Sequence, residues 1–217
     1  MPSGAYQRFL HNAVDVNRLI DSHGELSSGH SGKKALGHIT RSGVIMLCAA
    51  WEVYVEDLLI ESVKYISMHK ESPLELPKPV QKHLAKRIKE NKNELKLLEL
   101  GGAGWREIYV TYCQNETRSI NTPKTPILEA IYEKFIGIEN LSSLWNVGGG
   151  YITDFVSTRG DIAHKGRSAP YVNLWELTQY NDCIRLTAKE MDNQVCMYLF
   201  DLVTATVQPW RKFNEKC

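Results

Sequence analysis

The amino-acid sequence predicts an all-α fold organised around two long helices. Apolar residues recur three and four positions apart along most of the chain, and no stretch shows the strict alternation of a half-buried strand. The chain has 217 residues, of which 43% are hydrophobic, enough to bury one sizeable core. We therefore expect a single helical-bundle domain over residues 1–217, with residues 73–125 as an inserted helical segment.

The N-terminal stretch predicts one amphipathic helix of about five turns. Ser22-His23-Gly24 is expected to end this helix, and a Gly/Ser-rich loop follows through Gly32. The predicted buried stripe consists of Tyr6, Phe9, Leu10, Ala13, Val16, Leu19 and Ile20.

A proline-free stretch from Lys33 to about His69 predicts one long central helix. Its middle is apolar almost all round, which implies contact with several partner helices. Ser72-Pro73 ends the pattern.

The segment 73–125 opens with three prolines, at positions 73, 77 and 79, and continues with a strongly basic stretch. We expect a basic helix from Val80 to about Leu100, broken by the glycines at 101–104, and a shorter helix over Trp105–Asn115. Thr125-Pro126 then predicts a helix start, with the threonine hydroxyl as cap and proline in the first turn.

The last two helices follow a glycine triplet and a proline. Gly148-Gly149-Gly150 precedes one helix, which Gly166 and Pro170 close, and a final helix is expected from about Leu174 to Thr206. The inward face of this final helix is predicted to hold Leu177, Tyr180, Ile184, Leu186, Met191, Val195, Leu199 and Leu202.

Charge and cysteine usage limit the classes of function. The formal net charge is +1, so any nucleic-acid surface must be a local patch. The five cysteines are scattered and include no Cys-x-x-Cys pair, and no basic-then-apolar leader begins the chain. We therefore expect a reduced, cytoplasmic protein. The longest apolar run, 44–51, is far shorter than the ~20 residues of a membrane span.

The most informative stretch is Arg159-Gly160-Asp161-Ile162-Ala163-His164, at the end of the helix before Gly166. RNA is cut without a metal when one group removes the 2′-hydroxyl proton and another protonates the leaving 5′-oxygen. An imidazole, which changes charge near neutrality, suits either role. A guanidinium suits the stabilisation of charge on the phosphate oxygens. We assign these roles to His164 and Arg159.

Helix geometry constrains this assignment. Five residues along a helix correspond to about 140° of rotation and ~7.5 Å of rise. The two side chains converge only if the long arginine reaches across or if the helix loosens near Gly160. One motif also provides a single proton-transfer group, whereas the reaction needs two. We therefore expect a homodimer whose two motif helices face each other.

The Arg-x4-His motif before a glycine resembles the HEPN superfamily, and the chain is most similar to its RiboL-PSP-HEPN branch. The stretch Ala49-Ala50-Trp51-Glu52-Val53-Tyr54 supports the resemblance, because related proteins carry an acidic residue in the equivalent helix. The resemblance implies a dimeric, metal-independent endoribonuclease without cofactor, in toxin–antitoxin, antiviral or RNA-processing systems. Its products would carry a 2′,3′-cyclic phosphate and a 5′-hydroxyl. Glu52 would then orient the arginine or the histidine.

The sequence also departs from the pattern of the superfamily. Many members have a polar residue directly after the arginine, where this chain has Gly160 and offers Asp161 one place later. A toxin subgroup has a tyrosine two residues after the histidine, which a partner nucleotidyltransferase modifies. Gly166 stands there in this chain, so that form of neutralisation is not expected.

Each candidate residue also has a structural interpretation. Arg159 and His164 could be a surface arginine and a helix-terminal histidine, and Glu52 could form a structural ion pair. Asp161 is expected to be a solvated or helix-bracing acid, paired with Lys165 four residues on. Lys165 and Arg167 could equally hold an RNA backbone or be solvated.

A series of basic side chains between residues 78 and 96 is the strongest local charge bias in the sequence. These side chains could line an RNA groove or match an acidic antitoxin. Because Glu90 and Glu94 are interleaved with the cations, a solvated outer face is the favoured interpretation. An alternative function is therefore a non-catalytic helical module that binds RNA or protein. No histidine or cysteine pair has metal-ligand spacing. The basic series is Lys78, Lys82, Lys86, Arg87, Lys89, Lys92 and Lys96.

Overall fold

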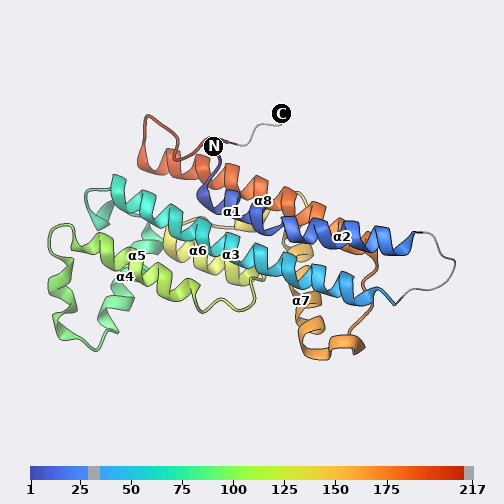
Figure 1. The fold of residues 1–217 in the computed structure, drawn as a ribbon. Coiled ribbons are helices and arrows are strands. Elements are labelled where there is room, and N and C mark those ends of the chain that lie inside the picture. Colours follow the sequence, from blue (N-terminus) through green and yellow to red (C-terminus); the bar gives the residue numbers. More distant parts are fainter. Residues whose placement is uncertain (29–34, 213–217) are drawn as a thin grey trace.

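A computed structural model describes residues 1–28 and 35–212 (Figure 1). Within these ranges every regular element is helical, which confirms the predicted all-α class. The two longest helices, α3 and α8, are the two predicted from the sequence. The α-helices are α1 (Gly4–Asn12), α2 (Val14–Ser27), α3 (Gly37–His69), α4 (Lys78–Lys89), α5 (Gly104–Thr117), α6 (Thr125–Ile136), α7 (Gly148–Lys165) and α8 (Leu174–Val203). Short 3-10 helices cover Pro73–Glu75 (η1), Glu94–Leu100 (η2), Leu141–Leu144 (η3) and Gly166–Ser168 (η4).

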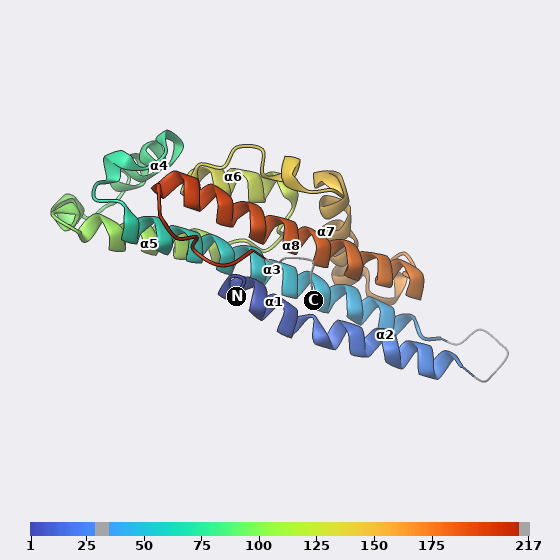
Figure 2. The same ribbon diagram turned by 90° about the horizontal axis from the view of Figure 1, so that it is seen from above.

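Helix α3 is the centre of the bundle, as its apolar middle predicted. It packs against α1, α2, α5, α6, α7 and α8, and both views show α8 running alongside it (Figures 1 and 2). Trp51, Tyr54 and Leu58 are fully buried on its inner face, and each such side chain contributes about 1.5–3 kcal/mol through apolar burial. The Tyr54 hydroxyl donates to the Ala188 carbonyl of α8 at 2.7 Å. The first predicted residue of this helix, Lys33, lies outside the described residues.

The N-terminal prediction of a single helix was wrong. The helix divides at Ala13, whose carbonyl accepts a hydrogen bond from Arg185 of α8 at 3.1 Å. The expected stop at Ser22-His23-Gly24 was also wrong, because α2 continues to Ser27. The hydroxyls of Ser27 and Ser28 donate to the carbonyls of Gly24 and Glu25. These bonds satisfy backbone carbonyls in the last turn of α2 and offset the modest cost of a glycine in the helix.

The basic helix is shorter than predicted. α4 ends at Lys89, and the 3-10 helix η2 replaces its expected second half. Asn91 and Asn93 cause the change, since the Asn91 side chain accepts from the Asn93 amide at 2.9 Å and the Asn93 side chain accepts from the Leu95 amide at 3.0 Å. Such local side-chain bonds compete with a continuous helix.

Thr125 begins α6, but its hydroxyl does not cap the helix. It donates to the Gly149 carbonyl at 2.6 Å and so ties α6 to the start of α7. The glycine triplet, expected before the motif helix, forms its first turn instead. A Cβ at Gly149 would lie 2.6 Å from the Thr125 methyl carbon, so the close approach of the two helices requires glycine there.

The last helix agrees with the prediction except at its end and at one inward residue. Asn173 and Glu176 form a capping box at its start, and it ends at Val203 rather than Thr206. Leu186, predicted to face inward, is 40% exposed. Leu177, Ile184 and Met191 are buried as predicted.

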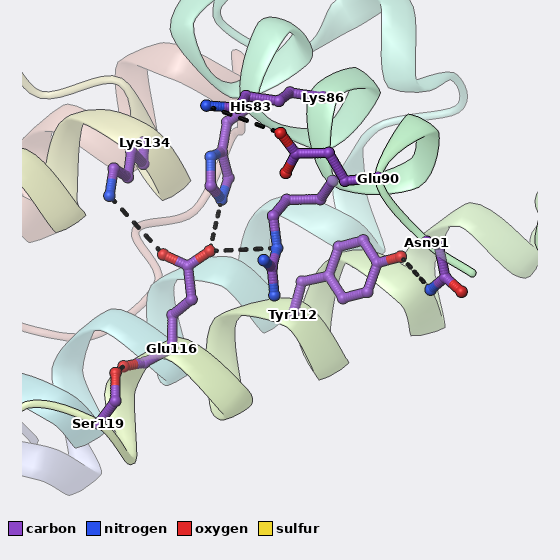
Figure 3. Close-up of polar contacts among 9 residues, drawn as sticks. His83, Lys86, Glu90, Asn91, Tyr112, Glu116, Ser119 and Lys134 are labelled. Carbon is purple, nitrogen blue, oxygen red and sulfur yellow. Dashed lines mark hydrogen bonds and ion pairs between the residues drawn. The ribbon is translucent and has the colours of Figure 1, made fainter. Parts of the chain in front are cut away.

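The Glu116 carboxylate links α4 to α5 and α6 through ion pairs (Figure 3). Glu116 of α5 pairs with His83 and Arg87 of α4, at 2.9 and 3.5 Å, and with Lys134 of α6 at 3.8 Å. Burial lowers the pKa of His83, and Lys134 and Arg87 add to this effect against the opposing pull of Glu116. The cluster accounts for Arg87 as a structural residue of the basic series.

The predicted domain organisation stays untested. α4, η2 and α5 all belong to the segment 73–125, and its status as an insertion in a single domain stays a prediction. Among the described residues, no helix is long and apolar enough to cross a bilayer.

Candidate active site

Arg159 and Glu52 meet between α7 and α3. The Arg159 Nη2 atom lies 3.6 Å from Glu52 Oε2, and the side chains are 28% and 19% exposed. Burial raises the pKa of Glu52, and the arginine charge opposes this shift. The carboxylate and the guanidinium thus form a partly buried ion pair at the boundary between the core and solvent.

Two further residues beside this pair were missed in the sequence. Burial raises the pKa of the Cys48 thiol to about 12, against the opposing effect of Arg159. Burial, together with the charges of Glu52 and Asp57, raises the pKa of Glu56 to about 7. The spacing Glu52-x3-Glu56 was a readable signal, because residues four apart share a helix face.

His164 lies in the last turn of α7, where its side chain is exposed. In the described part of the chain no hydrogen bond or ion pair engages its ring. The helix is continuous through Gly160 to Lys165, so the alternative of a loosened helix was wrong. Within one chain, Arg159 turns toward α3 and His164 lies about 140° around the helix from it.

Of the other charged residues near the motif, Asp161 and Lys165 pair with each other, whereas Arg167 lies apart from them. Asp161 Oδ1 pairs with Lys165 Nζ at 2.7 Å, and the two side chains are 44% and 55% exposed. This is the helix-bracing interaction expected four residues apart. Arg167 lies beyond the helix end in η4, where Gly166 with a φ of +53° turns the chain.

The face of α3 that carries Glu52 is apolar and open to solvent. Ile45, Met46 and Val53 are 40%, 37% and 38% exposed, and Ala49 is exposed between them. Because a helix turns about 100° per residue, these side chains share one face with Glu52 and Glu56. Below, this surface is called the α3 face. Clustered exposed apolar side chains are typical of contact surfaces.

Helix α7 thus presents an arginine paired with Glu52 on the α3 face and, about 140° around the helix, an exposed histidine. Among the described residues, no group of three or more His, Cys, Asp or Glu side chains is placed to hold a metal ion. The all-α fold is consistent with the HEPN superfamily.

The comparison with protein families agrees with this class. The sequence model of the RiboL-PSP-HEPN family matches residues 8–197, and the chain belongs to that family. No curated protein and no solved structure matches the chain. Membership in the HEPN superfamily suggests a nuclease-like or RNA-related role.

Proposed function

We propose that this protein is a metal-independent endoribonuclease that cleaves RNA through attack of the 2′-hydroxyl on the adjacent phosphate. The observation that carries the proposal is the Glu52–Arg159 pair, which orients a cation on the same helix that exposes His164. Arg159 would stabilise charge on the phosphate oxygens, and His164 would transfer a proton.

The active site is proposed to be composite. One chain provides a single motif histidine, whereas the reaction needs a base at the 2′-hydroxyl and an acid at the 5′-oxygen. A second copy placed across the α3 face brings a second histidine and arginine to the same phosphate. A two-fold axis makes the same patch contact itself, and the exposed Ile45, Met46 and Val53 are suited to this contact.

The setting is proposed from the family and the cysteines. Cys48, Cys113, Cys183 and Cys196 are free thiols, as expected for a cytoplasmic protein. A role in toxin–antitoxin or antiviral defence, with an antitoxin or defence-system partner, follows from the resemblance to the HEPN superfamily.

RNA cleavage in excess chelator tests the chemistry. Wild-type protein is expected to produce fragments with a 2′,3′-cyclic phosphate and a 5′-hydroxyl. His164→Ala and Arg159→Ala should each lower the rate by about 10²-fold or more. Lys124→Gln, remote in sequence from the motif, serves as the control. Activity that disappears with chelator, or that survives in His164→Ala, would contradict the proposal.

The oligomeric state tests the composite site. Val53→Glu places a charge on the α3 face and is expected to give an inactive monomer in sedimentation and cleavage assays. Leu186→Glu is a matched control, because Leu186 is 40% exposed and Val53 is 38% exposed. An active monomer, or equal effects of the two variants, would refute the composite site.

A second candidate function is a non-catalytic module that binds a protein partner. It is favoured by an apolar groove of about 510 Å³, lined by residues of α4, η2 and α5 such as Leu84, Leu97 and Trp105. The exposed Lys82 and Lys89 are also among its lining residues, which suits an acidic amphipathic helix. If this function holds, expression of the protein in cells should produce a phenotype that Leu97→Glu abolishes and that His164→Ala leaves unchanged.

A further inference from the structure

A second cavity, distinct from the apolar groove, lies where the start of α3 meets the segment that follows the motif helix, and its lining includes charged and polar side chains. It encloses about 430 Å³, and its lining residues are Ala35, Gly37, His38, Arg41, Arg167 and Tyr171. The cavity is therefore built from two parts of the chain that are more than a hundred residues apart in sequence.

The floor of this cavity is closely packed. A Cβ at Gly37 would lie 3.0 Å from a Tyr171 ring carbon and 3.1 Å from the Arg41 Nη1 atom. The ring and the guanidinium thus converge on one glycine. The Thr40 hydroxyl donates to the Val172 carbonyl at 2.6 Å, with both residues buried. This bond fixes Tyr171 relative to α3.

The lining of the cavity combines the aromatic ring of Tyr171 with the guanidinium groups of Arg41 and Arg167. Tyr171 is 63% exposed, whereas Trp51, Trp105, Trp145 and Trp210 are at most 8% exposed. In the described ranges, neither Arg41 nor Arg167 has a carboxylate within ion-pair distance. The positive end of the α3 dipole adds to the local field. An exposed ring beside two guanidinium groups provides a stacking surface for a base and a fork for a phosphate.

The cavity is also aligned with the motif. Arg41 precedes Glu52 by eleven residues, which is three helical turns, so both lie on the same side of α3 about 16 Å apart along its axis. Arg167 follows His164 by three residues. Arg41 therefore lies on the same side of α3 as the Glu52–Arg159 pair, and Arg167 lies in the turn that follows His164.

We propose that this cavity is a subsite for single-stranded RNA, in which one base stacks on Tyr171 and one phosphate binds between Arg41 and Arg167. The inference rests on the proposed nuclease function and names the form of its substrate. Unpaired RNA is required, because the bases of a duplex are stacked on one another and do not offer a free face to the ring.

Equilibrium binding in the His164→Ala background tests the subsite without cleavage. The probe is a fluorescent single-stranded RNA of about eight nucleotides, with its duplex and adenosine monophosphate in parallel. Tyr171→Ala should weaken single-strand binding roughly 10-fold, while Tyr171→Phe keeps most of it. Binding of the duplex should not change in Tyr171→Ala.

Arg41→Gln tests the phosphate contact. It should weaken binding and lower the slope of log K against log salt by about 0.7, the value for one phosphate on a single strand. Arg118→Gln, an exposed arginine of another region, and Trp175→Ala, whose ring is 69% exposed outside the cavity, are the matched controls. Circular dichroism melts establish that all variants are folded.

The outcomes separate this subsite from the nuclease proposal. Unchanged affinity in Tyr171→Ala and Arg41→Gln, with cleavage by the wild type intact, would refute the subsite alone. Variant-dependent binding in a protein that never cleaves RNA would support the subsite and refute the nuclease. Adenosine monophosphate that binds as tightly as the oligonucleotide, or equal losses in the control variants, would also overturn the subsite.

Discussion

Glu56→Gln should make the protein more stable above neutral pH. The pKa of Glu56 is raised to about 7 in the folded protein, first by burial and then by Glu52 and Asp57, whereas the ordinary value is 4.5. Between these two pH values the folded state binds more protons than the unfolded state. Stability from this group is therefore fully present below about pH 4.5 and is lost as the pH rises toward 7.

The size of this effect follows from the two pKa values. The difference corresponds to about 3 kcal/mol at 1.36 kcal/mol for each pH unit. Because the side chain is only partly buried, solvent screening reduces this to roughly 1–2 kcal/mol. Glutamine has the same shape and no charge, so the variant should recover that amount at pH 8 and show a flatter profile.

Urea unfolding at several pH values from 4.5 to 8 measures this profile. Asp192, whose pKa burial raises to about 6, contributes in the same window, so the difference between wild type and variant isolates Glu56. Glu133→Gln, on the exposed side of α6, should run parallel to wild type. A Glu56→Gln profile parallel to wild type, or a lower stability at pH 8, would show that the carboxylate is not destabilised as argued.

Three further predictions concern packing and buried polar groups, and thermal and urea unfolding measure all of them. A Cβ at Gly43 would lie 2.6 Å from a methyl carbon of the buried Leu177, so Gly43→Ala should cost about 1 kcal/mol; a gain would contradict the close packing of α3 on α8. Gly160→Ala meets nothing within 4 Å and should stabilise α7 by about 0.5–1 kcal/mol, and a loss would mean that the helix bends there. Asp192 is fully buried and accepts hydrogen bonds from the Ser3 amide and hydroxyl, so Asp192→Ala should cost roughly 1–3 kcal/mol, and a neutral result would refute the anchoring of the N-terminus.

Much of the helical architecture was readable because apolar spacing is a local signal. The helices around Trp51, Trp105 and Leu199 were all predicted with ends within a few residues of those observed. Errors occurred where side-chain hydrogen bonds to the backbone changed the end of a helix, either locally, as at Asn91 and Asn93, or from a distant helix. Arg185 of α8 donates to the Ala13 carbonyl where α1 and α2 divide, and no pattern within residues 1–28 contains that information.

The candidate site was partly readable for the same reason. The motif and an acidic residue on the central helix were visible, and the structure joins Arg159 to Glu52. The sequence did not reveal the raised pKa of Glu56, because desolvation depends on which helices cover the side chain. It also did not reveal Tyr171, since an isolated aromatic residue in sequence is more often buried.

By itself, the sequence determined that the chain folds into helices, that two of them are long, and that the arginine and histidine end one of them. These properties depend on residue spacing, helix breakers and the order of residues in one short motif. Only the tertiary structure decided that Glu52 pairs with Arg159, that the α3 face is open and that Arg41 and Tyr171 meet over Gly37. Such contacts join residues far apart in the chain, and their geometry is set by how the helices pack.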